Sequence, residues 1–195
     1  MYQEKIRHIL AKNKIIKTSD FSDSNIPKNY LPRLVLKGEL IKVGRGIYIQ
    51  DWSNYDEYKI FQFQHKVPIF SFLSALYLHG FTDIIPKYME FTVYSGYNAS
   101  RFDKNNQVHY VKKELFSLGM MRIETPFGNH VNCYNLERTI CDLIGNRSKM
   151  ERELFVSVMK EYVKLKDKDL NTLFKYAEIF GIEKEVLEIL EVMLE

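Results

Sequence analysis

A glycine–arginine–glycine turn is the feature that most constrains how the first part of this 195-residue chain folds. Gly44-Arg45-Gly46 separates two short segments in which apolar and polar residues alternate, residues 40–43 and 47–50. Such alternation predicts strands with one buried face, and glycine supplies the positive φ angles that a tight hairpin needs. We therefore expect a β-hairpin here. The turn does not require Arg45, whose side chain is expected to stand in water, where it can meet an acidic partner.

Three helical segments precede this hairpin. Apolar periodicity predicts a helix over residues 3–12, Thr18 can cap a short second helix, and a third helix is expected to end at Gly38. Helix, helix, helix and a two-stranded wing is the order of elements in a winged helix-turn-helix. We therefore predict a winged helix-turn-helix DNA-binding domain over residues 1–50.

Pro32 limits where the third helix can begin. Proline in a helix interior removes a backbone hydrogen bond and kinks the helix, whereas the first turn tolerates it. A helix that begins near Lys28 or Asn29 places Pro32 in the first turn. We favour this later start over one at Pro27, and we expect Lys28 and Asn29 to form the leading edge of the helix.

The charge of the chain is unevenly distributed. Residues 1–50 contain ten Lys or Arg residues and four acidic residues, a net charge of +6, whereas the other 145 residues contain 18 basic and 21 acidic residues, a net charge of −3. A basic segment on a mildly acidic chain is expected where one end meets a polyanion. Each basic residue taken alone is explained as an ordinary solvated charge. Together, the element order, the basic bias and the hairpin arginine favour nucleic-acid binding.

The third helix has the residue types that read a DNA groove. Leu31, Leu34 and Val35 share one face and are expected to pack inward, which leaves Arg33 and neighbouring polar residues outside. Arg and Lys bond guanine and Asn bonds adenine in the major groove, while an arginine on a wing reaches phosphate or the minor groove.

The sequence pattern of the remaining residues, 51–195, predicts an α+β domain that ends in helices. Strand patterns occupy residues 87–96, 107–113 and both sides of a Pro-Phe-Gly-Asn turn at residues 126–129. Helices are predicted over residues 71–79, over 136–145 with Asn135 as cap and Gly145 as end, and over about 150–165, 169–180 and 183–194.

This second part lacks the sequence signatures of common enzymes. No phosphate-binding loop, dinucleotide fingerprint, zinc-protease motif or nucleophile elbow occurs. Glu90 is not followed by the second carboxylate and lysine of a metal-dependent nuclease. We favour a core or capping role over a ligand role for His79, and a structural Arg138–Asp142 ion pair over a functional surface that includes Glu137. We therefore expect no enzymatic activity, no cofactor and no metal.

Two further patterns bear on the environment of the protein. The spacing of Cys133 and Cys141 fits no zinc template, so we expect free core thiols. No apolar run approaches the roughly 18 residues of a membrane helix, and charges interrupt the apolar residues at the N-terminus, unlike in a secretory signal. We therefore expect a cytoplasmic protein that does not enter a membrane.

Four stretches of the sequence together resemble the AbiEi antitoxins of bacterial abortive-infection systems. They are GRGIYI at residues 44–49, SALYLHGFTDIIPKYMEFTVYSGYN at 74–98, ETPFGNHVNCYNLERTICDLI at 124–144 and KDLNTLFKYAEIFGI at 168–182. The likeness covers nearly the whole chain and keeps the order of the motifs. Its most specific parts are Leu-His-Gly-Phe-Thr-Asp and Leu-Glu-Arg-Thr-Ile-Cys-Asp-Leu-Ile.

The resemblance implies the antitoxin of a two-gene, type IV toxin–antitoxin operon. Such a protein uses its winged helix to bind paired repeats in its own promoter and repress transcription. Its C-terminal domain counteracts a nucleotidyltransferase toxin, AbiEii, without a stable complex. We expect a monomer in solution that binds the repeats cooperatively.

The same resemblance makes Lys28, Asn29, Tyr30, Arg33 and Arg45 the DNA-facing residues, with Pro32 where a small polar residue is expected. The complete predicted DNA-binding set is Lys17, Thr18, Lys28, Asn29, Tyr30, Arg33, Lys37 and Arg45. Two alternatives remain: a winged-helix regulator unrelated to a toxin, with a ligand-sensing or oligomerising C-terminal domain, and a nuclease that the winged helix brings to DNA.

Overall fold

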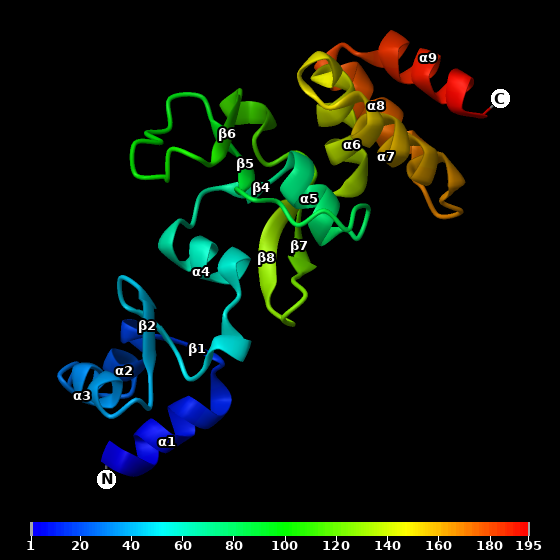
Figure 1. Ribbon diagram of the computed structural model, residues 1–195. Coiled ribbons are helices and arrows are strands. Elements are labelled where there is room, and N and C mark those ends of the chain that lie inside the picture. The colour runs from blue at the N-terminus through cyan, green and yellow to red at the C-terminus, as the bar shows by residue number, and fades with distance from the viewer. Residues whose placement is uncertain (1, 195) are drawn as a thin grey trace. The chain divides into compact units, whose positions relative to one another are not determined.

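The computed structural model describes residues 2–194, and its internal contacts divide the chain into two compact units (Figure 1). The first unit comprises the residues up to Lys66 together with Glu124–Val131, and the second comprises Val67–Ile123 and the residues from Asn132 onward. Each unit contains helices and a sheet, so the predicted mixed α+β fold is confirmed. The described residues of the predicted DNA-binding domain, 1–50, lie within the first unit, which extends beyond them.

The first unit packs its first three helices on one side of a small antiparallel sheet. Its elements in chain order are α1 (Tyr2–Lys12), β1 (Ile15–Lys17), α2 (Thr18–Asp23), α3 (Tyr30–Leu36), β2 (Ile41–Gly44), β3 (Ile47–Ile49), the 3-10 turn η1 (Trp52–Asn54) and α4 (Glu57–Gln64). The strand order is β1-β3-β2. Ile6 and Ile9 of α1, Phe21 of α2, and Leu31 and Leu34 of α3 form one buried cluster, which is the helical face that the apolar spacing predicts.

The helix α4 completes a second cluster in this unit. Ile60 of α4 is buried with Ile15 of β1 and with Ile47 and Ile49 of β3. The sheet therefore has apolar partners on both faces, one supplied by α1–α3 and the other by α4. A fragment that ends at residue 50 would expose the second of these clusters to water.

A buried carboxylate joins the remote segment Glu124–Val131 to the first unit. Asp56 is fully buried, and its Oδ2 accepts hydrogen bonds from Thr125 Oγ1 at 2.6 Å and Asn129 Nδ2 at 2.7 Å. Its Oδ1 accepts from the Lys59 backbone N at 3.0 Å and so caps α4. Lys59 Nζ donates to the His130 carbonyl at 2.6 Å. Because buried polar atoms are costly to leave unpaired, these bonds explain why this segment folds with residues far from it in sequence.

The second unit is built on a five-stranded sheet with helices gathered at one end, drawn from yellow to red in Figure 1. Its elements are β4 (Ile69–Phe70), α5 (Phe72–Leu78), β5 (Glu90–Tyr94), β6 (Gln107–Val111), the 3-10 turn η2 (Lys113–Leu115), β7 (Met120–Glu124), β8 (His130–Tyr134), α6 (Leu136–Gly145), the 3-10 turn η3 (Arg147–Lys149), α7 (Arg152–Lys164), α8 (Leu170–Phe180) and α9 (Glu183–Leu194). The strand order is β6-β5-β4-β8-β7, with β4 antiparallel to β5 and parallel to β8. The tips of β7 and β8 belong to the first unit.

A fully buried arginine connects several segments of the second unit. Arg138 of α6 has no exposed surface, and its Nε donates to Asp142 Oδ1 at 3.0 Å. Its Nη1 donates to the carbonyls of Leu115 at 3.1 Å and Leu118 at 3.0 Å. The ion pair that the spacing of four residues predicts is therefore present, and it is structural, since it lies inside the fold.

Two aromatic rings complete the surroundings of the Arg138 guanidinium. The Tyr134 ring at the end of β8 and the Phe180 ring at the end of α8 each lie 4.3 Å from the guanidinium carbon. Such cation–π contacts offset part of the cost of removing the charge from water. Within the described residues, Arg138 Nη2 and Asp142 Oδ2 have no hydrogen-bond partner. Burial raises the pKa of Asp142 to about 6, although Arg138 acts in the opposite direction.

Several smaller expectations from the sequence are also met in this unit. His79 is the C-cap residue of α5, and its Nε2 lies 2.8 Å from the Tyr134 carbonyl, which agrees with the core or capping role predicted above. Cys133 and Cys141 are free and buried. Burial raises the pKa of both thiols, that of Cys141 to about 12. None of the described helices combines the length and the apolar character that crossing a membrane requires.

We predict that Asp56→Ala lowers the free energy of unfolding of the full chain by about 3 kcal/mol, because it removes a helix cap and leaves buried donors unpaired. Urea denaturation followed by circular dichroism measures the change. Asp51→Ala is the matched control, since Asp51 caps the 3-10 turn η1 through the Ser53 backbone N but is exposed. Its effect should stay below about 1 kcal/mol. Equal losses in the two variants would contradict the role assigned to Asp56.

We also predict that Asp142 gives stability a specific pH dependence. In the folded chain, burial raises the pKa of Asp142 from its ordinary value of 3.8 to about 6. Between these values the folded state keeps a proton that the unfolded chain releases. Stability therefore falls as pH rises from 4 to 6, by at most about 1.4 kcal/mol per pH unit. Asp142→Asn removes this slope and keeps an oxygen acceptor for Arg138.

The test is the difference in free energy of unfolding between the wild type and Asp142→Asn, measured across this pH range. His79 contributes the opposite slope, because burial lowers its folded pKa, but it is present in both proteins and cancels. A difference that does not change with pH would show that Asp142 stays ionised throughout the range.

Candidate nucleic-acid interface

The helix α3 begins where the proline argument favoured. Its first residue is Tyr30, and Asn29 is its N-cap residue. A helical turn leads into it, because the backbone N of Tyr30 donates to the Pro27 carbonyl at 3.2 Å and that of Leu31 to the Lys28 carbonyl at 3.1 Å. Pro32 is consequently the third residue of the helix, where its missing N–H has no intrahelical partner to lose. Lys28 and Asn29 therefore stand at the leading end of α3.

The outer side of α3 is basic and exposed. Lys28, Asn29, Arg33 and Lys37 are all exposed, while Leu31 and Leu34 of the same helix are buried. Gly38 ends the helix with a φ of +71°, a conformation that glycine adopts without strain. The apolar spacing therefore predicts correctly which side of α3 is buried and which side is exposed.

Leu36 is a residue of this surface that our sequence reasoning missed. It is 87% exposed, although it follows directly on the apolar Leu34 and Val35. The spacing contains the signal, because a helix that turns Leu31 and Leu34 inward turns Leu36 outward. An outward leucine beside cationic side chains can contact the methyl group of thymine in a major groove.

Tyr30 has partners inside the protein. Its ring lies 5.6 Å from the ring of Tyr2 in α1, and the Arg33 guanidinium carbon lies 5.7 Å from the centre of the Tyr30 ring. The Tyr30 ring is half-buried. It therefore packs α1 against α3 and provides a surface on which Arg33 rests.

The β2–β3 hairpin displays Arg45 as the sequence predicts. Arg45 is exposed at the turn, and Gly46 has a φ of +70°. The Gly46 carbonyl accepts from the Thr18 backbone N at 2.9 Å and from Thr18 Oγ1 at 3.3 Å. A Cβ atom on Gly46 would lie 2.9 Å from Thr18 Oγ1, so this glycine is needed for both its conformation and its close approach to α2.

Lys17 and Thr18 each have partners inside the protein. Lys17 Nζ lies 3.8 Å from Asp20 Oδ1 and 4.8 Å from the centre of the Phe63 ring. Thr18 holds the hairpin turn. The eight predicted residues thus fall into two groups: Lys28, Asn29, Tyr30, Arg33 and Lys37 on or beside α3, and Lys17, Thr18 and Arg45 where the start of α2 meets the hairpin turn.

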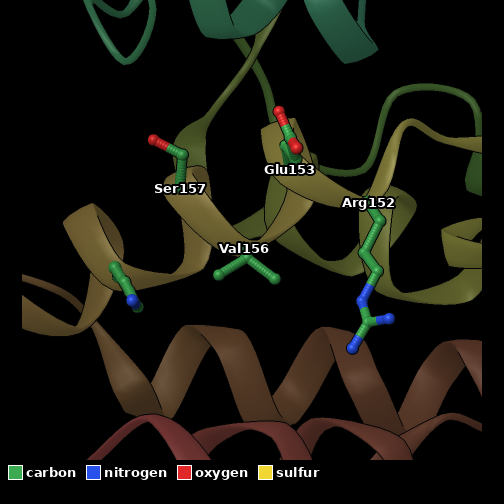
Figure 2. A pocket seen from close by; sticks show the side chains of 5 residues that line it. Arg152, Glu153, Val156 and Ser157 are labelled. Atoms are coloured by element: carbon green, nitrogen blue, oxygen red, sulfur yellow. The ribbon is translucent and has the colours of Figure 1, made fainter.

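The second unit contributes no candidate metal centre to the described part of the chain. Among residues 2–194, no three His, Cys, Asp or Glu side chains gather in a way that could hold a metal ion. A shallow groove runs along α7 in this unit and is lined by Arg152, Glu153, Val156, Ser157 and Lys160. Figure 2 shows Arg152 and Val156 pointing away from Glu153 and Ser157, so their polar groups do not meet at one point.

Comparison with known families bears on the first of these two units. Residues 4–49 match the family model described as a transcriptional regulator, AbiEi antitoxin. The predicted resemblance is therefore confirmed over this segment, which runs from α1 through β3. No curated protein matches the chain.

Proposed function

We propose that the first unit is a winged helix-turn-helix that binds operator DNA, with α3 in the major groove and the β2–β3 hairpin as the wing. One observation carries the proposal: the segment that matches the AbiEi regulators, residues 4–49, is also the segment that exposes Arg33 and Arg45. Exposed cations on a helix and on a nearby hairpin suit a duplex, which presents base edges in a groove and phosphates beside it.

The proposal gives the outer residues of α3 different roles. Asn29 and Arg33 lie near the start of the helix and have the side chains that read adenine and guanine. Lys28 and Lys37, at the two ends of the helix, meet phosphates. Leu36 contacts the thymine methyl group.

The remaining residues of the predicted set support this surface or extend it. Arg45 reaches phosphate or the minor groove from the wing. Thr18 positions the wing through its two bonds to Gly46, and Tyr30 positions Arg33. Lys17 keeps a half-exposed ammonium group beside them and adds to the attraction for phosphate.

For the whole chain we propose the antitoxin of a type IV toxin–antitoxin operon in the cytoplasm. Monomers bind cooperatively to paired repeats in the operon's own promoter and repress it. The second unit counteracts a nucleotidyltransferase toxin of the AbiEii type without a stable complex. The second candidate is a winged-helix regulator unrelated to a toxin, with a ligand-sensing second unit; a small cavity in that unit, described below, favours it.

We predict that Arg45→Ala weakens operator binding and lowers the slope of log affinity against log salt concentration by about 0.9, the value for one lost phosphate contact. Arg33→Ala should cost about 1–3 kcal/mol of binding free energy and relax specificity at one base pair. Mobility-shift titrations at several salt concentrations measure both quantities.

The matched control for these variants is Lys12→Ala. Lys12 is an exposed cation at the end of α1, in the same unit but outside the predicted set. Its removal should leave the salt slope nearly unchanged. If Arg45→Ala and Lys12→Ala behave alike, the hairpin is not a DNA-binding wing.

A co-expression experiment tests the antitoxin assignment. We expect the full chain to restore growth to cells that express the neighbouring nucleotidyltransferase gene. The double variant Arg33→Ala/Arg45→Ala should lose repression of the promoter but keep the rescue, since both substitutions lie on exposed side chains of the first unit. Point variants are preferable to deletion of residues 1–50, which would strip Ile60 of α4 of its buried apolar partners on β1 and β3. Repression without rescue by the wild type would favour the regulator unrelated to a toxin.

A further inference from the structure

A cavity in the second unit shares no residue with the proposed DNA-binding surface. It has a volume of about 310 Å³ and lies between the β5–β6 part of the sheet, the start of α5 and the connection from α6 to α7. This is the lower end of the range for small-molecule sites. Its inner wall carries Glu90, His109 and Asn146, all partly buried, above the buried ring of Phe72.

Phe72 holds an unusual backbone conformation at this cavity. Its φ is +50°, which is rare for a bulky residue and persists only where the surroundings enforce it. The neighbouring bonds do so. The Ser71 backbone N donates to the Glu90 carbonyl at 3.2 Å, and Ser74 Oγ accepts from the Glu90 backbone N at 2.9 Å. Strained residues of this kind cluster at ligand sites, so Phe72 points to a function for the cavity.

A flat aromatic pair lies beside a carboxylate at this cavity. The Phe72 ring stacks on the His109 imidazole with ring centres 3.7 Å apart and planes 18° apart. His109 Nε2 lies 3.4 Å from Glu90 Oε2. Glu90 and His109 lie on the same face of neighbouring parallel strands, two residues apart in register. The carboxylate and the imidazole are therefore fixed before any ligand arrives.

The α6–α7 connection supplies a second acceptor and an apolar wall. Asn146 Nδ2 donates to the Asp142 carbonyl at 2.9 Å, which leaves the amide oxygen to accept a hydrogen bond. Met150 and Leu154 line the same cavity, and the exposed Lys149 stands at its rim. The inner polar groups are thus mainly acceptors, set among aromatic and aliphatic surfaces.

We propose that this cavity binds a nucleobase that carries an exocyclic amine, held as a nucleoside monophosphate. The two N–H bonds of the exocyclic amine donate to Glu90 and Asn146, as carboxylates and amides read base edges elsewhere. The flat ring packs against His109, Met150 and Leu154, and Lys149 pairs with the phosphate. A free guanidinium fits less well, because its charge would be desolvated against one carboxylate that His109 already contacts.

Isothermal titration of the full-length protein with AMP, CMP, GMP and UMP tests the proposal. AMP, CMP and GMP carry the amine and should include at least one that binds roughly tenfold more tightly than UMP, which lacks it. Inorganic phosphate and free arginine are the probes without a base and should not bind. Absence of binding by all four nucleotides at millimolar concentration, UMP binding as tight as the others, or tighter binding of arginine would each overturn the proposal.

Variants of residues that line the cavity test whether the nucleotide binds there. Glu90→Gln should weaken binding of the tightest nucleotide about tenfold or more through loss of a charged acceptor, and Leu154→Trp should abolish it by filling the space. Glu153→Gln, next to Leu154 on α7 but on the exposed side, is the matched control and should bind like the wild type. Unchanged affinity in both cavity variants would overturn the assignment.

A second readout does not depend on the variants folding. In protein labelled at the methionine methyl groups, nucleotide should shift the NMR signal of Met150 and leave that of the exposed Met120 in place. A bound nucleotide that leaves Met150 unshifted would also overturn the assignment. The double variant Arg33→Ala/Arg45→Ala should titrate like the wild type, so a failure of the DNA-binding proposal leaves this test intact.

Discussion

The packing of the second unit depends on the partners of one buried cation, Arg138. A buried arginine must be compensated by acceptors and rings in good geometry, and removing one partner of such a group is far more costly than replacing the whole set. Arg138 collects its partners from the η2 region, from β8, from α8 and from its own helix. Its position therefore fixes α6 against the sheet. Asn146 lies at the end of the same helix, so the wall of the cavity follows from where Arg138 is held.

In the first unit, hydrogen bonds to one backbone carbonyl, rather than a buried charge, hold the hairpin in place. The Gly46 carbonyl accepts two bonds from Thr18, and only glycine fits the turn without meeting Thr18 Oγ1. The hairpin is thereby fixed to the start of α2, and Arg45 projects from a rigid base. Lys17 and Thr18 lie at that base, where each has an internal partner, and their contact with DNA stays a prediction.

The sequence predicted best those elements that carry their own local signals. Helix α6 has an N-cap at Asn135 that accepts from the Arg138 backbone N at 2.9 Å, and a glycine at its end. The exposed side of α3, the hairpin turn and the C-terminal helices likewise follow from periodicity and from glycine and proline positions. In each case a few neighbouring residues decide the local structure, so one sequence was enough.

Features that depend on distant partners escaped prediction. Strand β4 has two residues, too few to show a period, yet it lies at the centre of the sheet between β5 and β8. The Pro-Phe-Gly-Asn turn was predicted as a turn, but its place in the first unit depends on Asp56, about seventy residues earlier. The left-handed conformation of Phe72 has no local signature either, because backbone bonds to β5 impose it.

The arginines show why composition alone cannot tell which positive charges a nucleic acid could reach. Arg33, Arg45 and Arg138 contribute equally to the net charge, yet two of them are exposed and the third has no exposed surface. Counterion release from DNA requires a cation that can approach phosphate, which Arg138 cannot do. The charge asymmetry along the chain supports the proposed interface on the first unit only because Arg33 and Arg45 are exposed there. Burial therefore decides which positive charges are available to a nucleic acid and which only support the fold.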